Sequence, residues 1–313
     1  MNEDLKVFSA GANNALTQEI CDCIGIPLSQ LEISRFSNDN LFVQVKESVR
    51  EKDVFVVQSL TQPASENIMA LMLTLDALRS ASARRITAVI PYYSYARSDK
   101  KDAPRISIAG RLIADLLKTA GADRLLTMDL HADSVHGFFS MPVDHLTAIP
   151  TICDYFSQRL DLSQVVAVAT DAGGAKRVGR FANRLDIPMA FIDKRRISDS
   201  DVEQGLVVGE VEGKDAIVFD DEISTGSTLI TTVRTLKKAG VEKIYAGATH
   251  PVLCGNAVAN LKTADVTEIV VSNTVHISED KLFPKLKVLS MASLFSRAIL
   301  RIHTGESVSA LFE

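Results

Sequence analysis

Short apolar segments alternate with longer amphipathic segments along most of the chain. The runs DVFVVQS, RITAVIP and VVAVATD are rich in Val and Ile, and each precedes a segment whose apolar residues have helical spacing. This alternation is typical of β-α-β units and of a parallel sheet. The runs are continuously apolar, as is typical of strands that helices cover on both faces. The pattern therefore predicts an α/β fold with mainly parallel sheet flanked by helices.

Two stretches of the chain, residues 117–131 and 236–250, resemble each other. LKTAGADRLLTMDLH and LKKAGVEKIYAGATH share Leu, Lys, Ala, Gly and His in register. Each reads as a helix end, a glycine in the left-handed position, and a strand that ends at a histidine. Helix–glycine–strand units also recur by chance, but the shared residues favour a duplicated domain. We expect similar domains at residues 1–147 and 148–313, with the last helix able to pack back on the first domain.

Composition and charge narrow the class of protein. The 313 residues are 46% apolar and 23% charged, with a formal net charge of −5, as is usual for soluble globular proteins. Long Lys/Arg runs and apolar runs of membrane-spanning length are absent, so we expect neither nucleic acid nor a membrane as a partner. The cysteines lack C-x-x-C spacing, and the N-terminus lacks a secretory pattern. We predict a cytoplasmic protein with reduced thiols.

The stretch AIVFDDEISTGST, residues 216–228, predicts a site for a phosphorylated sugar. An apolar strand leads into two aspartates, and small hydroxylated residues follow before a helical pattern. The free N–H groups and the dipole of a helix N-terminus attract anions, and two carboxylates can accept hydrogen bonds from neighbouring sugar hydroxyls. We expect the sugar at Asp220 and Asp221 and its phosphate at Ser224, Thr225, Gly226, Ser227 and Thr228.

Other predicted strands also end in polar residues. PYYSYARSDK, MDLHAD and ATDAGGAKR each follow an apolar run. Ligands of open α/β sheets bind beyond the carboxyl ends of the strands, so these segments are candidate sites. A plain capped helix at residues 224–228 would leave them unexplained. A P-loop NTPase would need a G-x-x-x-x-G-K-[ST] motif, which the chain lacks.

These motifs together resemble one known family. Residues 216–228 resemble the phosphoribosyl diphosphate motif of type I phosphoribosyltransferases. Across residues 5–313, further motifs occur in the order typical of the ribose-phosphate diphosphokinases: RFSNDN, PYYSYARSDKK, AGADRLLTMDLHA, DAGGAKR, FIDKRR, ATHPVLCGNA and ESVSALFE. The resemblance implies two tandem type I phosphoribosyltransferase-like domains. It also implies transfer of the β,γ-diphosphate of Mg-ATP to the anomeric hydroxyl of ribose 5-phosphate, which releases AMP.

The resemblance implies how the residues would act on the two substrates. A sugar hydroxyl that attacks the β-phosphorus needs no covalent nucleophile, so catalysis depends on positioning and on neutralising charge. Lys194 and Arg196 match the catalytic basic pair of the family, with His131 as a further catalytic residue. Arg195 would face the other way, because neighbours on an extended segment point to opposite sides. The plain alternative for this run is a solvated basic turn.

A metal site and a diphosphate loop are implied in the same way. His131 and Asp171 match the Mg²⁺ ligands of the family, and the metal would tie the two halves together. Gly173 and Gly174 would let backbone amides approach the diphosphate. The plain alternative for His131 is a histidine whose hydrogen bonds are satisfied within the core, as expected for His250. The plain alternative for the two glycines is a tight turn.

The implied nucleotide site departs from the family pattern in one segment. Adenine would lie against Phe36, with Asn38 and Asn40 where members commonly have acidic residues. Arg97 and Asp99 would contact the nucleotide elsewhere. Because Asn both donates and accepts hydrogen bonds, the contacts to the adenine edge must differ from the usual ones.

The sugar-phosphate loop and the C-terminus carry further implications. Many members have Asp at position 224 and Gly at position 227, where this chain has Ser. Ser224 would change the grip on the sugar or its metal without removing the phosphate site. ESVSALFE, with Ser307 and Ser309, resembles a regulatory anion site at subunit contacts, although an ordinary C-terminal tail is the plain alternative. Phosphate and ADP are thus implied effectors, and a homo-oligomer, hexameric or built from dimers, is the implied assembly.

Two alternatives to a ribose-phosphate diphosphokinase stay open. A phosphoribosyltransferase would need only the aspartate motif and the diphosphate loop, but it would not explain MDLHA or DKRR. A catalytically weak regulatory paralogue would account for the changes at Asn38, Asn40 and Ser224. Retention of the implied catalytic and metal-binding residues argues against that paralogue.

Overall fold

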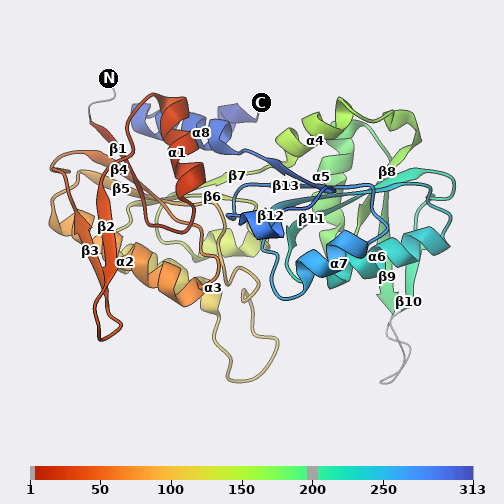
Figure 1. Cartoon of the computed structure of the whole chain (residues 1–313), viewed down its shortest axis with the longest axis horizontal. Helices are drawn as coiled ribbons and strands as arrows, with labels where there is room; N and C mark the ends of the chain where they lie inside the picture. The colour runs from red at the N-terminus through yellow and green to blue at the C-terminus, as the bar shows by residue number, and fades with distance from the viewer. Residues whose placement is uncertain (1–3, 196–203, 313) are drawn as a thin grey trace. The chain divides into compact units, whose positions relative to one another are not determined.

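The computed structural model describes residues 4–195 and 204–312 of the chain (Figure 1). It divides into two compact units. Unit 1 consists of Met1–Thr147, Thr274–His276 and Ser290–Glu313, and unit 2 of Ala148–Asn273 and Ile277–Leu289. The last helix, α8 (Ala292–Thr304), therefore belongs to unit 1.

Unit 1 is built on a five-stranded parallel sheet with the order β1-β4-β5-β6-β7. Helices α1 and α8 pack together on one side of it, and α2 and α3 on the other (Figure 1). A separate antiparallel hairpin joins β2 to β3. The strands are β1 (Leu5–Ser9), β2 (Leu31–Arg35), β3 (Leu41–Val45), β4 (Asp53–Val57), β5 (Arg85–Ile90), β6 (Arg124–Met128) and β7 (Val143–Leu146). The helices are α1 (Asn14–Ile24), α2 (Ala64–Ser80), α3 (Ala109–Ala120) and α8, with short η1 (Asp133–Phe138) and η5 (Ser309–Leu311).

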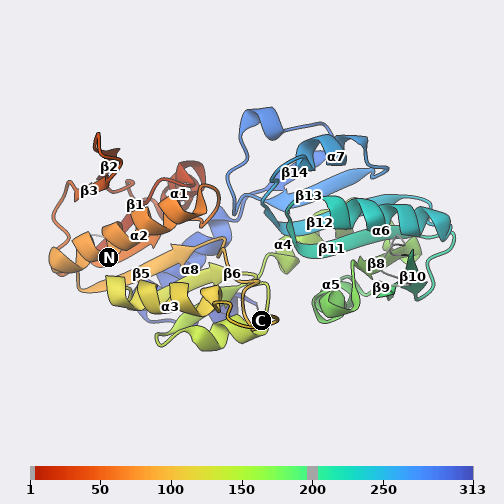
Figure 2. The same cartoon turned by 90° about the horizontal axis from the view of Figure 1, so that it is seen from below.

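Unit 2 contains a seven-stranded sheet with the order β10-β9-β8-β11-β12-β13-β14. All neighbouring strands are parallel except β10, which is antiparallel to β9. Helices α5 and α6 lie on opposite faces of the sheet (Figure 2). The strands are β8 (Val165–Ala169), β9 (Met189–Arg195), β10 (Gln204–Val208), β11 (Asp215–Ile223), β12 (Ile244–Pro251), β13 (Glu268–Ser272) and β14 (Leu286–Leu289). The helices are α4 (Ile149–Ser157), α5 (Ala175–Leu185), α6 (Ser227–Lys238) and α7 (Ala257–Thr263), with short η2 (Leu162–Gln164), η3 (Ala172–Gly174) and η4 (Glu279–Lys281).

The central strands are buried along their whole length. Every residue of β4, β8 and β12 is buried, so each of these strands has both faces covered. Covered strands remove all of their apolar side chains from water, which explains their continuous Val- and Ile-rich runs. The predicted α/β fold with mainly parallel sheets is thus confirmed.

The two units share one topology. Strands β1, β4, β5, β6 and β7 of unit 1 correspond in chain order and in sheet order to β8, β11, β12, β13 and β14 of unit 2. In each unit a hairpin follows the helix that comes after the first strand: β2-β3 follows α1, and β9-β10 follows α5. The pairing registers agree as well, because Leu5 pairs with Asp53 and Val165 pairs with Asp215. This correspondence is what a duplication requires.

The sequence repeat that suggested the duplication nevertheless matched the wrong elements. Residues 117–131 cover the end of α3 and β6, whereas residues 236–250 cover the end of α6 and most of β12. The counterpart of β6 is β13, so the repeat is out of step by one strand. What the two stretches share is local: Gly121 and Gly240 both follow a helix with positive φ, 119° and 83°, as predicted.

Candidate functional site

Two aspartates near the carboxyl end of β11, Asp220 and Asp221, form a charged network; we call them the aspartate pair. Nη1 of Arg177 donates to Oδ1 of Asp220 at 3.0 Å and to Oδ1 of Asp221 at 2.8 Å. The hydroxyl of Thr170 donates to Oδ2 of Asp220 at 3.0 Å. The Asp221 side chain is 1% exposed and that of Asp220 is 25% exposed. Asp220 is therefore the carboxylate of the pair that a ligand in solution can reach.

The electrostatics of the aspartate pair favour a retained proton. Burial, and then the neighbouring Asp221, raise the pKa of Asp220 to about 7, although the Arg177 guanidinium acts in the opposite direction. Two carboxyl groups this close titrate as a pair and not as independent acids. A ligand that needs both carboxylates ionised must therefore displace a proton near neutral pH.

The aspartate pair lies inside the strand, and the expectation that it follows the strand end was wrong. The parallel ladder between β11 and β12 continues to Glu222, opposite His250, and to Ile223. These backbone hydrogen bonds hold the chain extended beyond the apolar run that marked the predicted strand. His250 itself is buried within β12, at 2% exposure, which agrees with a core histidine.

The phosphate loop, residues 224–228, leads directly from β11 into α6. The helical pattern LITTVRTLKKAG predicted a helix start at Leu229. The helix begins two residues earlier, at Ser227, and no side chain caps it. Gly226 is the N-cap residue, and the hydroxyls of Thr225 and Ser227 lie 2.9 Å apart. A helix start without a side-chain cap has amide N–H groups for an anion. The predicted phosphate-binding residues thus lie together at one helix N-terminus, although their role stays a prediction.

Gly226 is the residue of this loop at which a side chain would be costly. Its φ of 76° is left-handed, and a Cβ would come within 3.3 Å of Cδ2 of Leu261. We expect Gly226→Ala to lower the free energy of unfolding, measured by urea denaturation, by about 1–2 kcal/mol. Gly213, with φ 70° and no atom within 4 Å of a Cβ, is the matched control for φ strain alone. A loss smaller than that of Gly213→Ala would contradict this expectation.

The predicted diphosphate loop lies between β8 and α5. Asp171 precedes η3, and its Oδ1 accepts a hydrogen bond from the Gly174 N–H at 2.9 Å. A Cβ on Gly173 would come within 3.2 Å of the same oxygen. The turn is therefore tight, as the plain alternative held, and it leaves little room for a side chain beside Asp171. The contact with diphosphate stays a prediction.

Thr170 and Arg177 are residues of this network that the sequence reasoning missed. Both belong to the quoted motif ATDAGGAKR, one before the predicted diphosphate loop and one in the first turn of α5. The structure shows that their side chains reach β11. The sequence around a basic residue in the first turn of a helix does not indicate which distant carboxylate its side chain will contact.

The basic run after Asp193 lies partly outside the described residues. Strand β9 extends through Arg195, because β10 pairs with it and places Gly205 opposite Lys194. The sequence predicted a strand over PMAFID, residues 188–193, with Lys194 after it, whereas Lys194 lies within the strand. Arg196 lies outside the described residues. The catalytic roles of Lys194 and Arg196 stay predictions.

In unit 1, Phe36, Asn38 and Asn40 lie in the turn of the β2-β3 hairpin. Phe36 is 56% exposed and contacts Phe42 edge to face, with ring centroids 5.5 Å apart. Oδ1 of Asn38 accepts a hydrogen bond from the Asn40 N–H at 3.3 Å. An exposed ring on a hairpin turn is open to stacking with a planar base. The structure brings these three predicted nucleotide contacts together.

Arg97 and Asp99 lie in the segment that follows β5. Arg97 is exposed, and Oδ2 of Asp99 accepts a hydrogen bond from the Ser134 hydroxyl at 3.0 Å. Ser134 belongs to η1, which follows the neighbouring strand β6. The segments that follow the carboxyl ends of two adjacent strands are therefore in contact. Ligands of parallel sheets bind beyond such strand ends.

His131 follows β6 by three residues and is half-buried. The preceding residue, Leu130, donates its N–H to Nε2 of His145 on β7 at 2.9 Å. His145, which was not among the predicted site residues, thus supports the turn that carries His131. Metal binding by His131 stays a prediction.

Unit 1 has neutral residues where unit 2 has the aspartate pair. The matching registers place Gln58 and Ser59 at the corresponding positions. Both are buried; Oε1 of Gln58 accepts from the Ala12 N–H at 2.9 Å, and its amide donates to the Asn67 carbonyl at 3.0 Å. Their polar groups are already engaged within unit 1, since the Ser59 hydroxyl also donates to the Thr274 carbonyl, so the duplicated topology does not duplicate the predicted sugar site.

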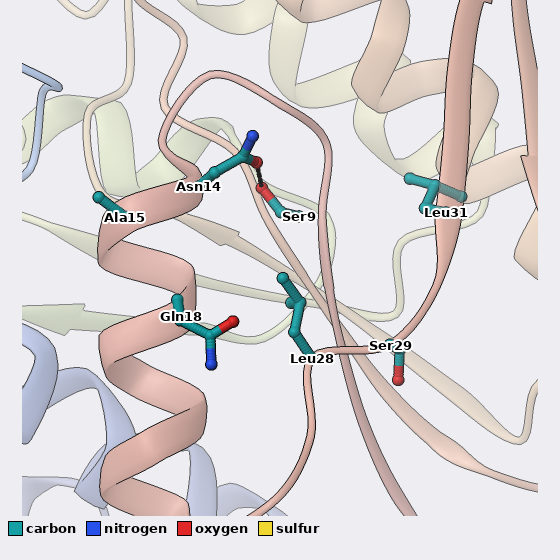
Figure 3. Close-up of a pocket in the computed structure, with 7 residues that line it drawn as sticks. All are labelled: Ser9, Asn14, Ala15, Gln18, Leu28, Ser29 and Leu31. Atoms are coloured by element: carbon teal, nitrogen blue, oxygen red, sulfur yellow. Dashed lines mark hydrogen bonds between the residues drawn. The ribbon is translucent and has the colours of Figure 1, made fainter.

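A pocket of about 470 Å³ lies in unit 1 beside the end of β1 (Figure 3). Its position after the first strand corresponds to that of the diphosphate loop in unit 2. However, the Gly11 N–H donates to the Ser9 hydroxyl at 3.3 Å, and the Ser9 hydroxyl donates to Oδ1 of Asn14 at 2.6 Å. No predicted site residue lines this pocket; its lining residues are Ser9, Asn14, Ala15, Gln18, Leu28, Ser29 and Leu31.

Residues 4–195 and 204–312 contain neither a cluster of metal-binding side chains nor a membrane-spanning helix. Within them, no three His, Cys, Asp or Glu side chains are arranged so that they could hold a metal ion. No helix in the same ranges has the length and apolar character needed to cross a bilayer.

The fold and the site define the class of this chain: it is an α/β protein with two units of the same topology, one of which carries two aspartates near a strand end before a helix N-terminus. A family model described as the N-terminal domain of ribose phosphate pyrophosphokinase matches residues 5–121. A second model, described as the phosphoribosyl synthetase-associated domain, matches residues 203–313. The chain belongs to the ribose-phosphate pyrophosphokinase family.

Full-length relatives support this assignment. The ribose-phosphate pyrophosphokinase of Deinococcus radiodurans is 51% identical over 312 residues, which cover 98% of each chain. That of Bacillus caldolyticus is 42% identical over 309 residues, covering 99% of this chain and 98% of the relative. The crystal structure of phosphoribosylpyrophosphate synthetase from Mycobacterium smegmatis superposes with a TM-score of 0.92 at 38% identity, covering 97% of this chain and 100% of that one.

Proposed function

We propose that this chain is a ribose-phosphate diphosphokinase. It transfers the β,γ-diphosphate of Mg-ATP to the anomeric hydroxyl of ribose 5-phosphate and produces 5-phosphoribosyl 1-diphosphate and AMP. The observation that carries the proposal is the junction of β11 with α6, where the aspartate pair and an uncapped helix start lie in one continuous segment. Relatives with this printed name over nearly the whole chain support it.

The sugar phosphate binds to unit 2 through groups of opposite character. Amide N–H groups and hydroxyls of the phosphate loop hold the phosphate, because the N-terminal end of a helix dipole is positive. Asp220 accepts hydrogen bonds from ring hydroxyls once it is ionised, and Asp221 stays in place through Arg177. The neutral Gln58 and Ser59 explain why unit 1 does not bind a second sugar phosphate in this way.

Lys194 and Arg196 would stabilise charge on the phosphoryl oxygens, and His131 and Asp171 are each proposed as ligands that would hold Mg²⁺. Asp171 fits a metal ligand because the Gly174 N–H fixes one of its carboxylate oxygens. Mg²⁺ is usually held by one or two carboxylates together with substrate phosphates. When bound, Mg²⁺ neutralises charge on the phosphates of the nucleotide.

Unit 1 supplies the nucleotide contacts in this proposal. Phe36 stacks on the adenine, and Asn38 and Asn40 contact its edge. Arg97 pairs with phosphate oxygens, and Asp99 is held in position by Ser134. In unit 2 the backbone amide of Gly173 is proposed to approach the diphosphate, because the Gly174 N–H already donates to Oδ1 of Asp171.

Regulation and assembly complete the proposal. Ser307 and Ser309 are exposed beyond α8, and the Ser307 carbonyl accepts a hydrogen bond from Arg301 at 3.0 Å. We assign these two serines to a site for phosphate or ADP in a homo-oligomer, hexameric or built from dimers. The two compact units are proposed to be the domains predicted at residues 1–147 and 148–313, with α8 packed on the first. Free thiols at all four cysteines suit a cytoplasmic protein.

The deciding experiment incubates the protein with Mg-ATP and ribose 5-phosphate and follows both products by phosphorus NMR. We expect AMP and 5-phosphoribosyl 1-diphosphate in equal amounts, and no AMP when ribose 5-phosphate is omitted. Consumption of 5-phosphoribosyl 1-diphosphate with a free base would instead show a phosphoribosyltransferase. Absence of turnover together with binding to an active synthetase would show the regulatory paralogue.

Sugar binding should depend on pH through Asp220. Its raised pKa of about 7 means that ribose 5-phosphate must displace a proton below that pH. We expect the affinity, measured by calorimetry, to weaken about tenfold per pH unit below the pKa and to level off above it. The phosphate of the ligand contributes its own step near pH 6. Asp220→Asn removes the carboxyl and should retain only that lower step; an unchanged profile in this variant would exclude Asp220 as the cause.

A further inference from the structure

A segment of unit 2 that no proposed ligand touches lies against the phosphate loop. This support segment, residues 252–261, runs from the end of β12 into α7. The carbonyl groups of three successive residues accept hydrogen bonds from it: Ile223 from the Leu253 N–H at 3.0 Å, Ser224 from the Cys254 N–H at 3.0 Å, and Thr225 from Nδ2 of Asn260 at 3.4 Å. The next residue, Gly226, faces Leu261 of the same segment.

These three hydrogen bonds determine where the amides of the loop point. Among the described residues, the one cis peptide bond joins Gln62 to Pro63, so the peptides of this loop are trans. In a planar trans peptide the C=O of one residue and the N–H of the next point in opposite directions. With its carbonyls bonded to the support segment, the loop directs the N–H groups of Ser224, Thr225 and Gly226 away from that segment. Successive N–H groups on one side of a loop form an anion-binding concavity.

A side-chain contact adds to the backbone contacts. The Ser224 hydroxyl lies 3.1 Å from Sγ of Cys254, and either atom can be the donor. The thiol therefore sets the direction of the hydroxyl at the first residue of the phosphate loop. The support segment is itself held, because Nζ of Lys281 donates to the Leu253 carbonyl at 3.1 Å.

We propose that the support segment positions the phosphate loop for the phosphate of ribose 5-phosphate, with Cys254 and Asn260 as positioning residues. This inference rests on the proposed function and adds the device that holds its anion site in shape. Neither residue touches the substrate. Each acts through a carbonyl or hydroxyl of the loop, so its loss lowers the affinity for the sugar phosphate and not for the nucleotide.

Steady-state kinetics of substituted enzymes test the proposal. We expect Asn260→Ala and Cys254→Ala each to raise KM for ribose 5-phosphate about fivefold, the loss expected for one hydrogen bond. KM for ATP and kcat should stay unchanged, and Cys254→Ser should restore KM, because a hydroxyl replaces the thiol. Thr263→Ala is the matched control on α7, since Thr263 bonds to the Ala259 and Asn260 carbonyls and not to the loop. Equal effects on both substrates, or none on either, would overturn the positioning role.

Alkylation of the thiols is a second readout that needs no turnover. Cys254 is half-buried and Cys23 is exposed, whereas burial raises the pKa of the Cys21 thiol to about 11 and that of Cys153 to about 12, which slows their reaction. We expect ribose 5-phosphate to slow alkylation of Cys254 by iodoacetamide severalfold, as resolved by mass spectrometry, with Cys23 unaffected as the internal reference.

The outcomes separate this inference from the proposed function. If ribose 5-phosphate binds in calorimetry while both Cys254 alkylation and the KM values of the variants stay unchanged, the support segment has no positioning role and the function stands. If ribose 5-phosphate does not bind at all, the proposed function fails and the inference fails with it.

Discussion

Replacing Asp53 by alanine is expected to lower the free energy of unfolding of unit 1 by about 3–5 kcal/mol. The Asp53 side chain is fully buried at the start of β4, where Oδ1 accepts from Nε of Arg85 at 2.8 Å and Oδ2 accepts from Nη2 of the same arginine. Nδ1 of His303, near the end of α8, lies 2.7 Å from Oδ2. These contacts join the last helix to the sheet.

The size of the effect follows from the charges that Asp53 compensates. Its hydrogen bond to Arg85 raises the pKa of that guanidinium. The arginine stays charged even when the carboxylate is removed, because a guanidinium does not deprotonate in proteins. The half-buried guanidinium then lacks its anion. Its Nη2 also donates to the Ile302 carbonyl at 2.8 Å, and this hydrogen bond becomes less well fixed. Removal of one member of a buried ion pair costs far more than removal of an exposed pair.

Urea denaturation, followed by a signal from unit 1, measures this loss. Asp115→Ala is the control: its side chain is 49% exposed in an ion pair with Arg111 on α3, and we expect a loss below about 0.5 kcal/mol. Asp53→Asn keeps a hydrogen-bond acceptor without the charge, and its loss of free energy of unfolding should lie between those of Asp53→Ala and Asp115→Ala. If Asp53→Ala costs no more than Asp115→Ala, the network does not stabilise the docked α8.

Replacing Arg177 by methionine should weaken the binding of ribose 5-phosphate at pH 7 by tenfold or more, on the order of 1.4 kcal/mol. Arg177 is the cation bonded to both members of the aspartate pair, and its charge lowers the pKa of Asp220. Without it, the pair holds its proton more tightly, because two neighbouring carboxylates repel each other. A larger fraction of the protein then carries this proton, and binding of the sugar must displace it.

The same substitution should move the pH at which sugar binding weakens to a higher value. Calorimetric titrations with ribose 5-phosphate between pH 6 and 9 measure both the loss and this shift. Arg180→Met is the matched control, since Arg180 is an exposed arginine on the same helix, and it should leave both unchanged. A weaker affinity without a shift of the pH profile would mean that Arg177 acts by shape alone, and the electrostatic explanation would be wrong.

The amino-acid sequence by itself determined the local features of this protein. Continuous apolar runs indicated buried parallel strands, because a strand covered on both faces has no solvent-facing positions. Gly121 and Gly240 indicated helix ends, because few other residues adopt their positive φ. The aspartate pair and phosphate loop could also be read as one site, since β11, the loop and α6 are consecutive in the chain.

The tertiary structure alone decided which distant residues meet. Arg177 reaches Asp221 across 44 positions and His303 reaches Asp53 across 250. Sheet order sets these contacts, and nothing in the composition around either residue encodes its partner. The out-of-step repeat of residues 117–131 and 236–250 failed for the same reason, because helix–glycine–strand units look alike wherever they stand in a sheet. Local sequence sets the conformation of a segment, whereas its neighbours in space are set by how all segments together bury their apolar faces.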